Sequence, residues 1–358
     1  MTDASAAALA TGTLYGDHVH PIKRTINDSG IEMVCDTHRS QLIACGLDIA
    51  DVAGFNVLEC GGTGRDALGW ARLGAKHVTH IDLSASNVER LKAYCESAGI
   101  DNLTAINGNI LDHDLPQQSY DIVRSRGVWH HLEYPARGLA RYASWCKVGG
   151  LVHLNAYRAG TFYYYGVTMF RELADLVPIE VIEKVMDEAG VTATRAGCLL
   201  DDFYVPFMHP LTHQCVADDF ARVGLAVIWP ENRQWDEVNH DIRYPDMPEK
   251  VEHIQYWMRK EQHVDPSPEL ISSLSYQSAQ DERRLASNVA GADMSQSAFA
   301  EFSDAARRSA DTELVAHELV KAYLVHHYEI SVLPMSALER HTRLSQQLQR
   351  ATERVANR

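Results

Sequence analysis

Between residues 55 and 158 the chain alternates short apolar runs with amphipathic stretches, and this alternation limits the possible folds more than any other feature. Five apolar runs predict buried strands: NVLEC, HVTHIDL, LTAING, YDIVRS and GLVHLNAY. The stretches between them have helical spacing. In one of them, Ser86 followed by Glu89 is a capping-box pattern, and Gly99 suits the residue just past the helix. Strands that alternate with helices need parallel crossovers, so we predict an open, mostly parallel α/β sheet with helices on both faces.

After residue 158 the pattern changes. Residues 161–210 have helical patterns behind an aromatic run, and the strand run LAVIW follows them, so we predict a helical insertion. From about residue 240 no strand pattern is visible, whereas apolar residues recur at helical spacing and Ser336 with Glu339 indicates a capped helix. We therefore predict three parts: an N-terminal helical segment at 1–50, a ligand-binding domain at 51–235 and a helical C-terminal extension at 240–358.

The charge and the cysteines limit the possible partners. The chain has 48 acidic and 33 basic residues, a formal net charge of −15. Such a surface repels phosphate backbones and anionic lipids, so we expect neither a nucleic-acid nor a membrane partner. The seven cysteines lie in apolar segments without a C-x-x-C pair. This favours reduced thiols in a cytoplasmic protein over disulfides or a zinc site, and we predict no metal.

A glycine cluster carries most of the functional information. The first predicted strand ends at Glu59, the turn ECGGTG supplies Gly61, Gly62 and Gly64, and the second strand ends at Asp82. Ligands of open α/β sheets bind at the carboxyl ends of strands, and a carboxylate there accepts hydrogen bonds from a ribose diol. The turn also fits G-x-G-x-x-A, the pattern of nicotinamide dinucleotide enzymes, so the cofactor stays open on this segment alone, and a tight turn without a ligand is a further alternative.

The rest of the domain resembles the class I S-adenosylmethionine methyltransferases from about residue 50 to 158, and more loosely to 235. The resemblance rests on the glycine turn and on segments that follow it in order: Val78 to Ser84, Gly108-Asn109-Ile110, Tyr120 to Val123, Trp129-His130-His131-Leu132 and Lys147 to Gly150. It implies a Rossmann-like fold with a seven-stranded sheet and S-adenosylmethionine as the cofactor. The glycine turn is one residue shorter than the family pattern, and Asn109 replaces the more frequent Asp.

The resemblance also implies roles for particular residues. The first strand end and the glycine turn, with Glu59, Cys60, Gly61, Gly62 and Gly64, would face the methionine part of the cofactor. Asp82 would bind the ribose hydroxyls, Leu83 and Ile110 would flank the adenine, and Asn109 would meet the adenine edge through its amide. The N-terminal segment, with Tyr15 and His18, would fold over the cofactor as a lid and contact the substrate.

Two groups of residues are candidates for the acceptor side. His130 and His131 are predicted to contact the substrate or to act as the base for a hydroxyl acceptor, although this pair recurs in relatives with different acceptors. Tyr163 and Tyr164 open the insertion, where their faces suit a cationic acceptor. The alternative is that these aromatic residues only attach the insertion to the sheet.

These observations predict an enzyme that transfers a methyl group to a small molecule by in-line displacement, with oxygen as the first choice of acceptor atom and nitrogen or sulfur after it. Two alternatives remain. One is an NAD(P)-dependent oxidoreductase that uses the same glycine turn. The other is a protein-directed methyltransferase whose C-terminal helices recruit the substrate. The same helices are the expected interface of a possible homodimer.

Overall fold

The computed structural model describes residues 4–20, 26–158, 162–211, 213–229, 253–274, 291–330 and 335–357. The chain divides into two compact units. The first, called here the sheet unit, comprises the described residues of 1–157, 206–242 and 253–278. The second, called the helical unit, comprises those of 158–205, 243–252 and 279–358. None of the described helices is long and apolar enough to cross a membrane.

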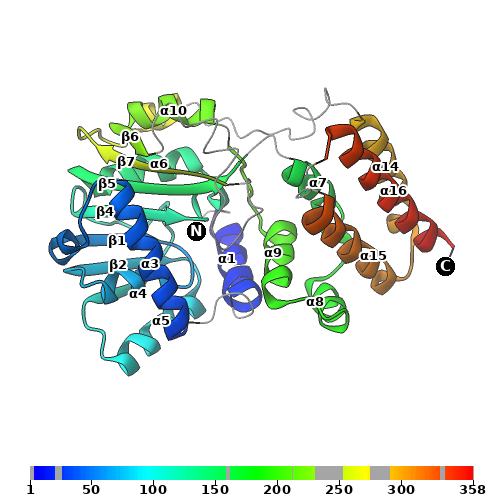
Figure 1. The fold of residues 1–358 in the computed structure, drawn as a ribbon, viewed down its shortest axis with the longest axis horizontal. Coiled ribbons are helices and arrows are strands. Elements are labelled where there is room, and N and C mark those ends of the chain that lie inside the picture. The colour runs from blue at the N-terminus through cyan, green and yellow to red at the C-terminus, as the bar shows by residue number, and fades with distance from the viewer. Residues whose placement is uncertain are drawn as a thin grey trace. The chain divides into compact units, whose positions relative to one another are not determined.

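The sheet unit holds every described strand. Its strands are β1 (Asn56–Cys60), β2 (His77–Asp82), β3 (Leu103–Asn107), β4 (Tyr120–Arg126), β5 (Cys146–Tyr157), β6 (Leu225–Trp229) and β7 (His253–Lys260). Its helices are α1 (Ala4–Thr13), the π-helical turn η1 (Leu14–Val19), α3 (Asp28–Ala44), η2 (Ile49–Gly54), α4 (Arg65–Arg72), α5 (Ala85–Ala98), η3 (Trp129–His131), α6 (Pro135–Trp145), α10 (His213–Arg222) and α12 (Pro268–Ser273) (Figure 1).

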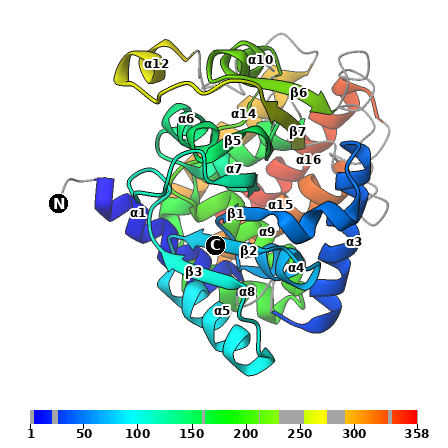
Figure 2. The ribbon, with the colours of Figure 1, turned by 90° about the vertical axis from the view of Figure 1, so that its left-hand side faces the viewer.

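The seven strands form one sheet in the order β3-β2-β1-β4-β5-β7-β6, which runs from β3 at one edge to β6 at the other (Figure 2). The pairs β1–β2, β2–β3, β1–β4 and β4–β5 are parallel, and β7 is antiparallel to both β5 and β6. The strand order reverses between β1 and β4. This confirms the predicted Rossmann-like, mostly parallel sheet, and it places the expected ligand-binding edge at the carboxyl ends of β1 and β4.

Both faces of the sheet are covered, as parallel strands require. On one face α6 and α10 pack on alternate strand residues such as Leu58, Val123 and Val152. On the other face α3 and α4 cover Val57 and Ile122. Because successive side chains of a strand point to opposite faces, a short run that is apolar throughout is what a doubly covered strand needs.

Strand β7 corrects the prediction that the chain is helical from residue 240 onward. His253–Lys260 pairs with β5 on one side and β6 on the other, so the sheet extends past the predicted boundary at 235. The strand was not recognised because it is buried on both faces and has no clear polar–apolar alternation. A run of this kind cannot be distinguished from a helix segment by periodicity alone.

The predicted helix ends are correct in two places and wrong in one. Gly99 ends α5 in the left-handed region at φ 65°. Ser336 and Glu339 form a reciprocal capping box at the start of the last helix. The N-cap of α5, however, is Ser84 rather than Ser86: its hydroxyl accepts from the backbone N–H of Asn87, since the helix begins two residues earlier than predicted.

The helical unit joins the insertion to the C-terminal helices, which the sequence analysis assigned to separate parts. Its elements are α7 (Phe162–Arg171), η4 (Ala174–Leu176), α8 (Ile179–Glu188), α9 (Ala193–Tyr204), α14 (Ala292–Arg308), α15 (Thr312–Val325), η6 (His326–Ile330) and α16 (Ala337–Ala356). The apolar residues predicted to line one face of a helix, Val315, Leu319 and Tyr323, are all buried in α15.

Candidate functional site

The glycine turn lies at the carboxyl end of β1, beside the loop that follows β4. Gly61, Gly62 and Gly64 have φ of 81°, 87° and 84°, a region that side chains disfavour. A Cβ at Gly61 would lie 2.6 Å from Cγ2 of Val128, so the two loops are in contact, whereas a Cβ at Gly62 would meet no atom within 4 Å. The turn therefore exposes backbone to open space where the strand order reverses.

Asp82 ends the neighbouring strand β2 and is almost fully buried. Its Oδ1 accepts from the backbone N–H of Ser84 at 2.8 Å and from the side-chain amide of Asn87 at 3.2 Å. Burial raises the pKa of Asp82 to about 6, although these donors and the backbone N–H of Gly62 favour the ionised form. The carboxylate thus lies next to the glycine turn with its orientation fixed.

Glu59 has a different environment from the one predicted. Its carboxylate is buried between two donors of the sheet unit: Nη1 of Arg124 at 2.8 Å and Nε1 of Trp70 at 3.1 Å. Burial raises the pKa of Glu59 to about 7, against the attraction of the Arg124 guanidinium. Both carboxylate oxygens of Glu59 therefore have partners within the sheet unit, and its contact with the methionine part of a cofactor stays a prediction. Cys60 is fully buried in the core, and burial raises the pKa of its thiol, so it remains neutral.

The three residues predicted to contact an adenine ring have different environments. Leu83 is half-buried at the end of β2. Asn109 closes its own turn: its Oδ1 accepts from the backbone N–H of Leu111 at 2.9 Å, and its Nδ2 donates to Asp112 at 3.0 Å. Ile110 packs into the core beside Leu58. The amide of Asn109 is thus engaged in the turn, an Asx-type arrangement that its sequence position alone does not reveal.

The two histidines of η3 have opposite hydrogen-bonding roles. Nδ1 of His131 lies 2.9 Å from the carbonyl oxygen of Phe207. A carbonyl only accepts, so Nδ1 carries the proton and Nε2 of neutral His131 carries the lone pair. In His130, Nδ1 accepts from the backbone N–H of Tyr157 at 3.3 Å, which puts the proton on Nε2. That Nε2 is buried without a hydrogen-bond partner among the described residues, and burial holds the pKa of His130 well below its usual range.

The N-terminal segment packs over the end of β2. A Cβ at Gly12 would lie 2.9 Å from the carbonyl oxygen of Leu83, and one at Gly16 would lie 2.1 Å from Oγ of Ser84. The ring of Tyr15 lies 5.7 Å from that of His131, and Nδ1 of His20 lies 2.7 Å from the Asn87 amide that reaches Asp82. Tyr15 and His20 therefore connect the Asp82 region to the η3 histidines.

His18 is half-buried within η1. Helix α3, the other part of the predicted lid, packs instead on α4, where the ring of His38 stacks on Trp70 at 3.9 Å. This contact lies on the face of the sheet that α4 covers, so of the predicted 1–50 lid only α1 and η1 lie at the ligand-binding edge.

Comparisons with known proteins find a family match for the part of the chain that holds this edge. Residues 57–150 match the family model described as a methyltransferase domain, a range that starts at β1 and ends in β5. Residues 57–150 thus match a methyltransferase domain, and the parallel strands β1 to β5 of the sheet lie within or across this range. The glycine turn, Asp82 and the η3 histidines all lie within this range.

Similar proteins are distant and match in part. An uncharacterised protein of Synechococcus is 33% identical over 81 residues, which is 22% of this chain and 19% of that relative. The 1,6-didemethyltoxoflavin-N1-methyltransferase of Burkholderia thailandensis, solved with 1,6-didemethyltoxoflavin and S-adenosylhomocysteine, is 13% identical over 72% of this chain and 89% of that chain, with a TM-score of 0.43. An S-adenosylmethionine-dependent methyltransferase from Mesorhizobium loti is 18% identical over 58% and 92%, with a TM-score of 0.38.

Two residues predicted to bind substrate lie outside the methyltransferase domain. Tyr163 and Tyr164 are buried in the helical unit, with 4% and 1% of their surface exposed. The hydroxyl of Tyr163 donates to Asp202, which also accepts from Tyr323 at 2.5 Å. His326 approaches the Tyr163 carbonyl at 2.9 Å. These contacts join the insertion to the C-terminal helices, and the substrate contact of the two tyrosines stays a prediction.

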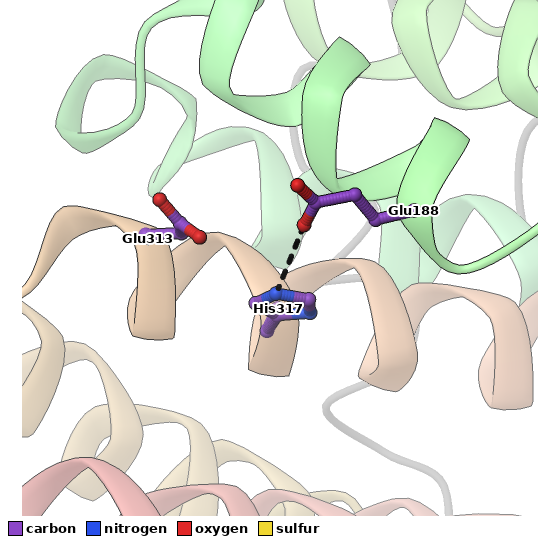
Figure 3. Close-up of side chains that lie close together, drawn as sticks. All are labelled: Glu188, Glu313 and His317. Carbon is purple, nitrogen blue, oxygen red and sulfur yellow. Dashed lines mark ion pairs between the residues drawn. The ribbon is translucent and has the colours of Figure 1, made fainter.

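The helical unit also contains a cluster with possible metal ligands, Glu188, Glu313 and His317, on α8 and α15 (Figure 3). Nζ of Lys184 lies 2.8 Å from Glu313 and 3.8 Å from Glu188, and His317 lies 4.0 Å from Glu188. The ammonium group already supplies a cation to both carboxylates, and the side chains are about half exposed. The cluster is a surface ion-pair network of the kind that contributes little to stability.

Several residues of the methyltransferase site were not selected from the sequence. Asn87 and His20 connect to Asp82, and Arg124 and Arg126 lie beneath and beside the glycine turn. The arginines had a signal, because two charged residues at alternate positions of an otherwise apolar strand share one face and need buried partners. The contact between Asn87 and His20 had none, since it joins residues that are 67 apart in the sequence.

Proposed function

We propose that this protein binds S-adenosylmethionine at the carboxyl ends of β1, β2 and β4 and methylates a small-molecule acceptor. The observation that carries the proposal is a left-handed glycine turn open to space at Gly62, with the Asp82 carboxylate beside it, inside residues that match a methyltransferase domain. The family match favours S-adenosylmethionine over the dinucleotide that the G-x-G-x-x-A pattern also allowed.

The residues of this edge fit such a cofactor. The Asp82 carboxylate would accept hydrogen bonds from a ribose diol, and the backbone at Gly62 would approach the amino-acid part without a side chain in between. S-adenosylmethionine supplies an electrophilic methyl group on a sulfonium. The protein would then mainly hold the acceptor in line with this group and exclude water, which lowers the barrier without covalent chemistry.

The hydrogen bonds of η3 support an oxygen acceptor with His131 as its base. The lone pair of neutral His131 is on Nε2, whereas the accepting nitrogen of His130 is already engaged by Tyr157. His131 is therefore the better proton acceptor, and His130 presents an N–H that would orient a polar group. Nitrogen and sulfur acceptors need less help from a base and come second.

The experiment is a screen of hydroxyl, amine and thiol metabolites for formation of S-adenosylhomocysteine by the wild-type protein. We expect turnover with at least one hydroxyl acceptor and none with the Asp82→Ala variant, while Asp36→Ala, an exposed site on α3, leaves turnover unchanged. Turnover with a protein substrate alone would favour recruitment through the C-terminal helices. The proposal fails if the wild-type protein methylates nothing and reduces or oxidises a substrate with NAD(P).

The expected cytoplasmic location and the homodimer through the C-terminal helices are further proposals. Light scattering of the purified chain tests the second one directly. A monomer at micromolar concentration would contradict it.

A further inference from the structure

The last residue of β4, Arg126, belongs to a cluster of charges next to the glycine turn. Nη1 of Arg124 contacts Glu59 at 2.8 Å and Asp66 at 2.7 Å. Asp66, in the first turn of α4, also contacts Nη1 of Arg126 at 3.2 Å. Arg124 is fully buried, whereas 29% of the Arg126 side chain is exposed. Arg126 is therefore the member of the cluster that reaches the accessible edge of the sheet.

The cluster holds two guanidiniums and two carboxyls, and its most exposed member is the guanidinium of Arg126. Its two guanidiniums are positive, and they hold the pKa of Asp66 well below its usual range despite the burial that opposes ionisation. Burial raises the pKa of the other carboxyl, Glu59, to about 7, against the attraction of the Arg124 guanidinium. In addition, Nε and Nη2 of Arg124 are buried with no hydrogen-bond partner among the described residues. The more exposed Arg126 shares the Asp66 carboxylate with Arg124, so a carboxylate ligand would give Arg126 a partner of its own.

Arg126 lies where such a ligand has room. The next residue, Gly127, has a φ of 68°, and a Cβ built there would meet no atom within 4 Å. The following residue, Val128, is the one that touches Gly61, so the open backbone at Gly127 and that at Gly62 belong to loops in contact. Arg126 thus borders the same open edge as the glycine turn, at the point where the strand order reverses.

We propose that the Arg126 guanidinium, held in place by Asp66, binds the α-carboxylate of the amino-acid part of the cofactor. Arg suits this role because its planar fork matches a carboxylate with two parallel hydrogen bonds. Asp66 contacts Nη1 of Arg126, and the remaining N–H groups of this partly exposed guanidinium would bind the ligand. The inference rests on the proposed function, because it concerns the amino-acid part of S-adenosylmethionine at the same site.

The test compares two probes by calorimetric titration: S-adenosylhomocysteine, which has the carboxylate, and 5′-methylthioadenosine, which lacks the amino-acid part. We expect Arg126→Met to weaken S-adenosylhomocysteine binding by about 10- to 100-fold and to change methylthioadenosine binding by less than about 2-fold. Arg126→Lys should recover part of the lost affinity. The control Arg39→Met removes an exposed arginine that pairs with Asp36 at 2.7 Å on α3, and it should change neither affinity.

Three other titration results would overturn either the Arg126 contact or the proposed function. If Arg126→Met binds S-adenosylhomocysteine as tightly as the wild type, the carboxylate contact is wrong and the proposed function stands. If the variant loses both probes equally while its melting temperature is unchanged, Arg126 does not discriminate the carboxylate and the inference is also overturned. If the wild-type protein binds neither probe, the proposed function itself fails.

Discussion

At the scale of single residues, the buried Arg124 links the sheet to the glycine turn. Replacing it with leucine leaves the carboxylates of Glu59 and Asp66 without their main partner in the interior. Removing one member of a buried ion pair is costly, so we expect Arg124→Leu to lower the free energy of unfolding by about 3 kcal/mol or more. Urea denaturation measures this. The control Arg72→Leu, which breaks exposed ion pairs with Asp28 and Glu32, should cost about 1 kcal/mol or less, and equal losses would contradict the account.

The ionisation of Asp82 should make cofactor binding depend on pH. Its pKa is raised to about 6 by burial, and only the ionised carboxylate can accept from both ribose hydroxyls. Protonation therefore removes acceptors, so affinity for S-adenosylhomocysteine should fall as the pH drops from 7 to 5. Titrations over this range measure the effect. Asp82→Asn should bind more weakly with a flatter pH dependence, and an unchanged slope in that variant would assign the titration to another group.

The two histidines of η3 should differ in kinetics. We expect His131→Gln to lower kcat for a hydroxyl acceptor by about 10²- to 10⁴-fold, because it removes the lone pair that takes the proton. His130→Gln keeps a donor amide and should lower kcat by a smaller factor. Steady-state rates of both variants check this, and a His131→Gln enzyme with wild-type kcat would eliminate the base.

At the scale of elements, the N-terminal segment depends on a glycine for its position. Gly16 lies against the loop that begins α5, where an added Cβ would be 2.1 Å from Oγ of Ser84. We expect Gly16→Ala to displace η1, to move Tyr15 and His20 from the site, and to weaken S-adenosylhomocysteine binding by about 10-fold. The matched control is Gly54→Ala, because a Cβ at Gly54 meets nothing within 4 Å. If Gly16→Ala binds with wild-type affinity, the segment is not part of the binding site.

The same elements show what the sequence predicts well and what it does not. β1 and β2 were predicted within about one residue because a doubly covered strand is apolar throughout and a glycine turn ends it. Strand β7 was missed because its residues give no period. The position of Asn109 predicted an adenine contact, but the turn that engages its amide depends on a backbone geometry that no residue type specifies.

At the scale of the whole molecule, the sheet depends on β7, a strand that is far along the chain from its neighbour β5. A protein truncated after residue 240 lacks β7, which pairs with β5 and β6 in the interior of the sheet. We therefore expect this truncation to lose cooperative thermal unfolding, in contrast to the full chain, as circular dichroism would show. A truncated chain with a wild-type melting temperature would contradict the strand order.

Sequence motifs predict the order of residues along the chain, but they do not predict which distant segments pack together. The residues predicted for the cofactor follow one another along the chain from β1 to η3, and the structure brings Gly62 next to Asp82 among them. The grouping of the insertion with the C-terminal helices was not predicted, since the contact of Tyr163 with Asp202 and Tyr323 joins segments without any shared pattern. Buried tyrosines of this kind and substrate-binding tyrosines have the same sequence signal.

We propose that the edge formed by the glycine turn and Asp82 binds S-adenosylmethionine. The most direct test of this proposal is calorimetric titration of the full chain with S-adenosylhomocysteine and, separately, with NAD. We expect saturable 1:1 binding of S-adenosylhomocysteine that Asp82→Ala abolishes, and no binding of NAD. Binding of NAD without S-adenosylhomocysteine, or binding of S-adenosylhomocysteine that Asp82→Ala leaves unchanged, would contradict it.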